Sequence, residues 1–322
     1  MPIRSAAFVA AAVTAAVVLA GCQEQRPGAT RPPISWATAP TSDDQYLATM
    51  AAARAIDPCA LVPRSALDAI GTVLNVEADT PSSCAAELNS TEFGSKTSLS
   101  WSITVNRDPL DSFDGGVESR IGDAVVFAEQ DEAGPESGVQ VHSCMATARF
   151  PVTIGLFVQM TTPVADKPCA LLDSILPGAL DVLRSAPAIG TSPDTPKTVV
   201  AGANPCAVLT RLGTTTPPTR QFVHGCVFEY QGSNIDLQYS YTGERMVVQG
   251  EPILVVNGHP GYDLRSITEG YWYGAVLGPA MPSTGKANSF YGPRVPVVKL
   301  MGRDPAVLRE VLTRTAELFP AT

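Results

Sequence analysis

The stretch DPCALV (57–62) has two near copies in the chain, KPCALL (167–172) and NPCAVL (204–209). After DPCALV and NPCAVL the sequence runs in the same order: a short helical pattern, a turn-rich segment, a second cysteine and an alternating strand. KPCALL instead opens an apolar helical pattern over 168–183 and aligns with DPAVL (304–308) at the start of the last helical pattern. We therefore interpret KPCALL as the closing helix of the first repeat, and the chain as two repeats.

The strand that follows the second cysteine is predicted in both repeats, because apolar residues alternate there with polar ones. In the first repeat the alternating residues are Leu99, Trp101, Ile103 and Val105, and in the second Ile235, Leu237, Tyr239 and Tyr241. The predicted fold class is α+β: two tandem domains, each with an opening helix, a twisted, mainly antiparallel sheet and a closing helix, stapled by disulfides.

The domain boundaries follow from changes in composition. Residues 23–42 and 185–202 are rich in Pro, Thr, Ser, Ala or Gly and show no periodicity, which favours a spacer and a linker. Ser42-Asp43-Asp44 can cap a helix that runs to Ala55. We expect a signal peptide at 1–21, a disordered tether at 22–42, a first domain at 43–185, a linker at 186–202 and a second domain at 203–322.

The N-terminus predicts export and lipidation. Arg4 precedes an apolar run, 6–20, that is shorter than the roughly 20 residues a spanning helix needs. Leu19-Ala20-Gly21-Cys22 resembles the bacterial lipobox, which implies that Cys22 carries acyl chains such as palmitate after cleavage. We expect a lipid-anchored protein on the extracytoplasmic side of the cell membrane; the alternative is an ordinary secretory signal beside a chance cysteine.

Six further cysteines fit three disulfides in an exported protein, although six cysteines allow 15 connectivities. The repeat comparison chooses among them. The second repeat lacks counterparts of both Cys144 and Cys169, and partners that are absent together are expected to be paired. We therefore predict the pairs Cys59–Cys84, Cys144–Cys169 and Cys206–Cys226.

These motifs resemble a family of actinobacterial lipoproteins, mycobacterial in type and of unknown function. The first repeat matches it at Asp57-Pro58-Cys59-Ala60-Leu61-Val62, Cys84, Ile121-Gly122-Asp123-Ala124, Cys144 and Cys169. The second matches at Asn204-Pro205-Cys206-Ala207-Val208-Leu209, Cys226 and Val256-Asn257-Gly258-His259-Pro260. The chain departs from the family in Asn204, in the lost second bridge and in the missing Trp after Cys84 and Cys226. The resemblance implies a compact α+β domain without established catalysis; related folds serve as sensor or partner-binding modules in mycobacterial envelopes.

The charge is uneven between the two repeats. Residues 22–199 hold 11 basic and 22 acidic residues, a net charge of −11, whereas residues 200–322 hold 10 and 9, a net charge of +1. An acidic first half disfavours nucleic acid and anionic lipid as its partners. We expect no nucleic-acid partner.

Motifs for catalysis and metal binding are missing from the sequence. It has no G-x-S-x-G, no H-E-x-x-H, no C-x-x-C and no Gly-rich phosphate loop before a helix. The three histidines are scattered and are interpreted as structural or surface residues: His142, His224 and His259. One acidic run lacks the ligand spacing of an EF-hand and is interpreted as a solvated face: Asp108, Asp111, Asp114 and Glu118. We expect no cofactor, no metal and no enzymatic activity.

The best candidate for function is an aromatic group in the second repeat. A 17-residue Gly/Pro-rich loop, 278–294, follows an aromatic strand, and long loops in compact domains are often functional. Aromatic residues with polar atoms suit binding surfaces. The candidate binding residues are Tyr271, Trp272, Tyr273, Phe290 and Tyr291. The alternative is that the rings pack against the closing helix and the loop only connects.

The sequence therefore predicts a non-catalytic binding or scaffold module of the cell envelope, tethered to the membrane through Cys22. Its second domain would present the aromatic group to an envelope protein or to a lipid or glycan. Two alternatives remain open: a hydrolase-like envelope enzyme with an unrecognised site, or a structural spacer without a ligand.

Overall fold

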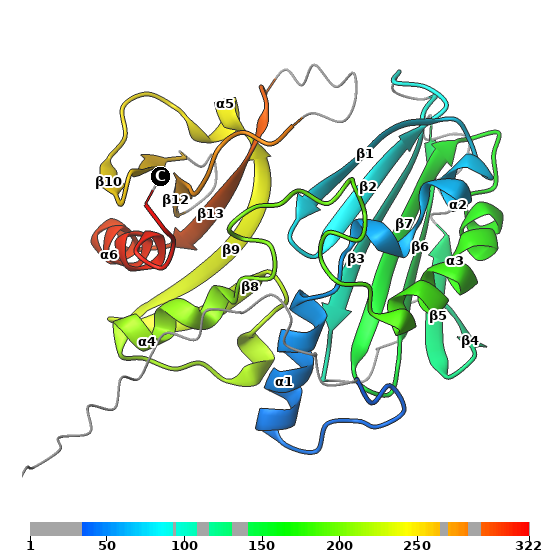
Figure 1. Ribbon diagram of the computed structural model, residues 1–322, viewed down its shortest axis with the longest axis horizontal. Helices are drawn as coiled ribbons and strands as arrows, with labels where there is room; N and C mark the ends of the chain where they lie inside the picture. Colours follow the sequence, from blue (N-terminus) through cyan, green and yellow to red (C-terminus); the bar gives the residue numbers. More distant parts are fainter. Residues whose placement is uncertain are drawn as a thin grey trace, which may run out of the picture. The chain divides into compact units, whose positions relative to one another are not determined.

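The computed structural model describes residues 34–92, 95–107, 116–130, 141–264, 270–282 and 291–321. They belong to one compact unit, Ile34–Thr322, which has an α+β fold with two antiparallel sheets (Figure 1). The predicted signal peptide and Cys22 lie outside the described residues, as do Asp108, Asp111, Asp114 and Phe290.

The first sheet has seven strands in the order β1-β2-β3-β7-β6-β5-β4. Its strands are β1 (Val73–Thr80), β2 (Ser83–Leu88), β3 (Thr97–Val105), β4 (Val117–Ile121), β5 (Ala124–Gln130), β6 (Val141–Arg149) and β7 (Ile154–Pro163). The helices of this half are α1 (Asp43–Arg54), η1 (Cys59–Leu61), α2 (Arg64–Asp68) and α3 (Pro168–Ser185). KPCALL thus begins the closing helix α3, as the repeat comparison predicts.

The second sheet has six strands in the order β10-β11-β12-β13-β9-β8. Its strands are β8 (Gly225–Tyr230), β9 (Ser233–Gly243), β10 (Leu254–Val256), β11 (His259–Asp263), β12 (Tyr271–Val276) and β13 (Arg294–Gly302). Its helices are η3 (Pro205–Ala207), α4 (Val208–Leu212), η4 (Pro218–Arg220), α5 (Glu244–Val247) and the closing helix α6 (Pro305–Ala316). The central strands β9 and β13 pair antiparallel over eight residues each, from Arg294 opposite Gly243 to Met301 opposite Asp236.

Local sequence signals account for the helix starts. Ser42 caps α1 by accepting a hydrogen bond from the backbone N–H of Gln45. Asp304 caps α6 by accepting from the N–H groups of Ala306 and Val307. Pro305 occupies the first turn of α6, where its missing N–H costs nothing.

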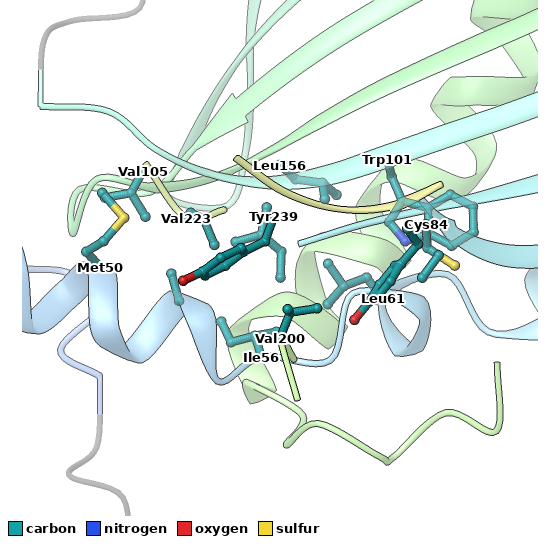
Figure 2. Close-up of a cluster of buried hydrophobic side chains, with 14 of the residues drawn as sticks. Met50, Ile56, Leu61, Cys84, Trp101, Val105, Leu156, Val200, Val223 and Tyr239 are labelled. Atoms are coloured by element: carbon teal, nitrogen blue, oxygen red, sulfur yellow. The ribbon is translucent and has the colours of Figure 1, made fainter. Parts of the chain in front are cut away.

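The alternating residues predicted for the two strands are confirmed, because every one of them is buried. Side chains from both repeats meet in one hydrophobic cluster. Figure 2 shows Met50 and Ile56 from the first repeat close to Val223 and Tyr239 from the second, with Val200 from the connecting segment. The two sheets therefore share a core rather than each closing its own.

A buried arginine also joins the two halves. Arg54, at the end of α1, is 7% exposed, and its guanidinium donates to the carbonyl oxygens of Val223 (3.1 Å) and Phe222 (3.0 Å). Burial lowers its pKa to about 10. The backbone carbonyls supply acceptors that this desolvated cation needs.

The described residues form three disulfides, and they are the predicted pairs: Cys59–Cys84, Cys144–Cys169 and Cys206–Cys226. The loops that they close span 25, 25 and 20 residues. In the chain-entropy description a bridge over a loop of this size contributes about 3 kcal/mol to stability. The second bridge ties β6 to α3 and has no equivalent in the second repeat.

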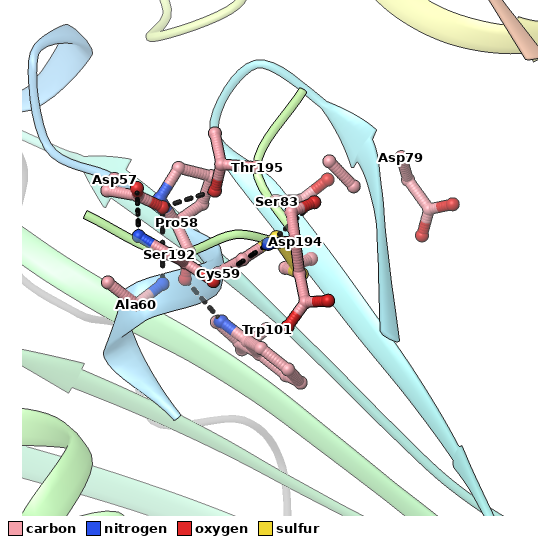
Figure 3. The surroundings of a disulfide bond; sticks show 12 residues. Asp57, Pro58, Cys59, Ala60, Asp79, Ser83, Trp101, Ser192, Asp194 and Thr195 are labelled. Atoms are coloured by element: carbon pink, nitrogen blue, oxygen red, sulfur yellow. Dashed lines mark hydrogen bonds between the residues drawn. A yellow bond between two sulfur atoms is a disulfide. The ribbon is translucent and has the colours of Figure 1, made fainter. Parts of the chain in front are cut away.

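The Asp57-Pro58-Cys59 motif holds the connecting segment, 186–202, against the first repeat (Figure 3). The Asp57 carboxylate is fully buried and accepts from the N–H groups of Gly190 and Ser192, both at 2.9 Å, and from the hydroxyl of Thr195. It also accepts from the N–H of Ala60, as an N-cap does. The segment expected to be a linker is therefore fixed at its start by one buried carboxylate.

The end of the predicted tether, 34–42, packs against the first sheet. The Trp36 ring meets Phe150 edge-on at a centroid distance of 4.9 Å, and the carbonyl of Trp36 accepts from the N–H of Val152. Trp36 and Ile34 are partly buried on the shared core. The described part of that segment thus belongs to the packed unit.

Candidate binding surface

The predicted aromatic residues of β12 lie on opposite faces of the second sheet, because side chains alternate along a strand. Tyr273 is 2% exposed and belongs to the shared core, which favours the alternative that rings pack against the closing helix. Trp272 points to the other face and is partly buried. Tyr271, at the start of β12, is 45% exposed.

The two ends of the predicted aromatic group are separated by the length of β13. Tyr271 pairs with Gly302, the last residue of β13, whereas Tyr291 lies just before Arg294, the first. A nine-residue strand spans about 26 Å at 3.3 Å per residue. The structure therefore does not bring Tyr271 and Tyr291 together, and the loop 278–294 is described only at its two ends.

The outer face of the second sheet, opposite the shared core, gathers a different set of side chains around Trp272. Trp272 pairs with Met301, and Met301 pairs with Asp236, so these three side chains form one row across β12, β13 and β9. Lys299 and Gln238 are paired in the next row. We call these five residues, Trp272, Met301, Asp236, Lys299 and Gln238, the Trp272 surface.

The other end of the outer face is apolar and covered. Val247 of α5 packs there against Tyr262 of β11 and against Val295 and Val297 of β13, and all four are buried. Leu264 lies close above Gly274, where a Cβ would meet its side chain at 3.0 Å. The Trp272 surface begins where this apolar cover ends, with Met301 37% exposed and Gln238 exposed.

Two hydrogen-bond donors of the Trp272 surface have no acceptor among the residues that the structure describes. The indole Nε1 of Trp272 is buried without a hydrogen-bond partner. Lys299 is partly buried, no hydrogen bond or ion pair joins it to another described residue, and burial lowers its pKa. The indole nitrogen is closed to solvent, so of these two donors it is the Lys299 ammonium that a ligand on the outer face could contact.

One acceptor of the surface is held in place. The Gln238 side-chain amide donates to both carboxylate oxygens of Asp236, at 3.2 and 3.3 Å. Burial raises the pKa of Asp236, and this hydrogen bond opposes the rise. The carboxylate is therefore fixed at the edge of the surface with lone pairs to spare.

The three histidines lie in separate environments. Nδ1 of His224 lies 2.8 Å from the Ser82 hydroxyl, and Nε2 of His259 lies 2.9 Å from the Pro320 carbonyl oxygen. Nδ1 of His142 is buried and has no hydrogen-bond partner among the described residues. Within the described ranges, no group of three or more His, Cys, Asp or Glu side chains could hold a metal ion. No helix among the described residues is long and apolar enough to cross a membrane.

The aromatic pattern of the sequence predicts Trp272 as a candidate binding residue, but it does not point to the residues beside Trp272 on the outer face. Lys299 is the one charged residue in the apolar run VPVVKLM (295–301), and Asp236 is an acidic residue inside an alternating strand. A charged residue within a predicted strand is therefore the sequence feature that could have pointed to Lys299 and Asp236. The pairing of β9 with β13, which brings the two residues near each other, is not visible in the sequence.

Comparisons with known proteins give no family assignment. No family model matches the chain, and no curated protein matches it. Among solved structures, a comparison pairs the chain with the crystal structure of DynU16, a protein of the dynemicin biosynthetic locus. The two are 10% identical over 65% of this chain and 81% of that chain, with a TM-score of 0.10, and a likeness this weak carries no argument.

Proposed function

We propose that the protein is a lipid-anchored, extracytoplasmic binding module of the cell envelope that does not catalyse a reaction. The lipobox-like Leu19-Ala20-Gly21-Cys22 supports anchoring through Cys22, and the three disulfides suit an oxidising compartment. The resemblance to actinobacterial lipoproteins supports the same location. In this proposal the Trp272 surface, rather than the whole aromatic loop, contacts the partner.

The observation that supports the binding role is Lys299, a partly buried cation on the outer face that has no acidic partner among the described residues. Partial desolvation of an ammonium group costs free energy unless a charged or polar partner compensates it. A purely structural spacer gains nothing from such a residue, since an apolar side chain at this position would avoid the cost. A ligand that supplies an acceptor to Lys299 offsets it in the bound state.

The test is site-specific photo-cross-linking in intact cells. A photoreactive amino acid replaces Met301, which is 37% exposed within the surface, or Val117, which is 69% exposed on β4 of the first sheet. We expect a discrete adduct, identified by mass spectrometry, from position 301 and none from position 117. The adduct should disappear when Lys299→Gln and Trp272→Phe are combined with the probe at 301.

Equal cross-linking from both positions would contradict the proposal, since it would mean that the probe reports chance encounters. An adduct at 301 that survives both substitutions would also contradict it. The thermal unfolding temperature of each variant is compared with that of the unaltered protein. A similar temperature shows that the adduct was not lost through unfolding.

A further inference from the structure

The Trp272 surface offers a ligand one positively charged donor group. The Lys299 ammonium has three N–H groups, and no described residue forms a hydrogen bond or ion pair with it. Because Lys299 is a cation, a negatively charged oxygen is its most favourable partner. The ligand should therefore carry an anionic group.

Asp236 can accept hydrogen bonds, so it favours a ligand that also carries hydrogen-bond donors. Its carboxylate has acceptor sites beyond the contacts that Gln238 makes at 3.2 and 3.3 Å. Hydroxyl groups are the neutral donors that suit such an acceptor. In the strand register Asp236 and Lys299 are diagonal neighbours on β9 and β13, a separation of about 7–8 Å, so one ligand can touch both.

Trp272 and Met301 supply an apolar part to the surface. They face each other directly across β12 and β13, where opposite Cβ atoms are about 4.5–5.5 Å apart. An indole ring and a flexible thioether pack well against C–H groups. A ligand that combines an anionic group, hydroxyls and C–H faces on a compact ring meets all of these requirements.

We propose that the Trp272 surface binds an anionic saccharide, a hydroxylated sugar ring that carries a carboxylate or a phosphate ester. This inference rests on the proposed function and gives its ligand a chemical class. The charge balance agrees with it, because residues 200–322 carry a net charge of +1 whereas residues 22–199 carry −11. An anion therefore meets less repulsion at the second sheet than at the first.

The test is isothermal titration calorimetry of the intact lipoprotein in detergent with three probes: a glucuronate tetrasaccharide, the neutral glucose tetrasaccharide of the same linkage, and glucose 6-phosphate. We expect at least one anionic probe to bind about tenfold more tightly than the neutral one, since hydrogen bonds to a charged group typically give a factor of this size. The carboxylate and phosphate probes distinguish the two sources of charge.

Three variants of the surface and one control locate the binding. Lys299→Gln should weaken the anionic probe about tenfold and abolish its advantage over the neutral one. Asp236→Asn should weaken the anionic probe severalfold, because it replaces a carboxylate acceptor by an amide. Trp272→Ala should also weaken it severalfold, because it removes the ring that packs against the C–H face of the sugar. Lys197→Gln, at an exposed lysine of the connecting segment, should change nothing.

Equal affinity for the anionic and neutral probes would overturn the proposal, as would a Lys299→Gln variant that binds the anionic probe normally. Binding of none of the three probes would overturn it too. In that case an adduct from position 301 in cells would still support the proposed function with another class of partner, so the two failures are distinguishable.

Discussion

The Ser82 hydroxyl lies 2.8 Å from Nδ1 of His224, and this hydrogen bond joins the β1–β2 turn of the first repeat to the segment before β8 in the second. Ser82 is fully buried. The guanidinium of Arg54 donates to the carbonyl of Val223, the residue before His224. A proton added to His224 would therefore place a second cation beside this junction.

Stability should fall in mild acid because of His224. Burial lowers its pKa in the folded protein, whereas the unfolded chain has a pKa of about 6.5. Below that pH the unfolded state binds a proton that the folded state does not, so the free energy of unfolding decreases as the pH falls from 6.5. Urea unfolding between pH 7.5 and pH 5 measures this. His224→Gln should flatten the dependence; an unchanged slope in that variant would contradict the assignment.

Asp57→Asn should destabilise the protein by about 2–4 kcal/mol, because an amide presents N–H groups to backbone donors and leaves buried groups unpaired. The matched control is Asp304→Asn at the exposed cap of α6, which should cost about 1 kcal/mol or less. Urea unfolding monitored by circular dichroism compares the two. Equal costs would mean that the connecting segment is not held by the Asp57 carboxylate.

Lys299→Met should leave the free energy of unfolding unchanged or raise it by up to about 1 kcal/mol, since it removes a partly desolvated cation from the sheet. The same variant should lose the cross-link from position 301. Gain of stability with loss of binding is the pattern expected of a functional residue. A clear loss of stability would instead assign Lys299 a structural role.

Cys22→Ala should release the protein from the membrane, because two or more acyl chains provide the stable anchor. Fractionation of cells labelled with a palmitate analogue measures both the label and the location. The unaltered protein should be labelled and sediment with membranes. A labelled or membrane-bound Cys22→Ala protein would rule out lipidation at this residue.

Much of the fold follows from the sequence because its signals are local. The alternation at Leu99 and Tyr239, the cap at Asp304 and the position of KPCALL each act within a few residues. The repeat comparison also supplied the disulfide pairs. The roles of Asp57 and Arg54 beyond their own helices were not predictable, because their partners lie more than 130 residues away.

The candidate site was predicted only in part, for the same physical reason. Tyr271, Trp272 and Tyr273 are neighbours in sequence, but alternation along β12 sends Tyr273 to the core and Trp272 to the outer face. Antiparallel pairing then places Asp236, rather than Tyr291, near Trp272. Residues that are brought together by strand pairing can be predicted only when the order of the strands is known, and the sequence pattern does not give that order.

The most direct measurement compares two single cysteines, Met301→Cys and Val117→Cys, in intact cells and in the purified protein, with a membrane-impermeant maleimide. Non-reducing gels confirm that the native disulfides are intact. The account predicts that Cys at 117 is labelled in both settings, whereas Cys at 301 is labelled only after purification, because a partner covers the Trp272 surface in the envelope. No labelling at 117 in cells would contradict the extracytoplasmic location, and equal labelling at both positions in cells would contradict an occupied Trp272 surface.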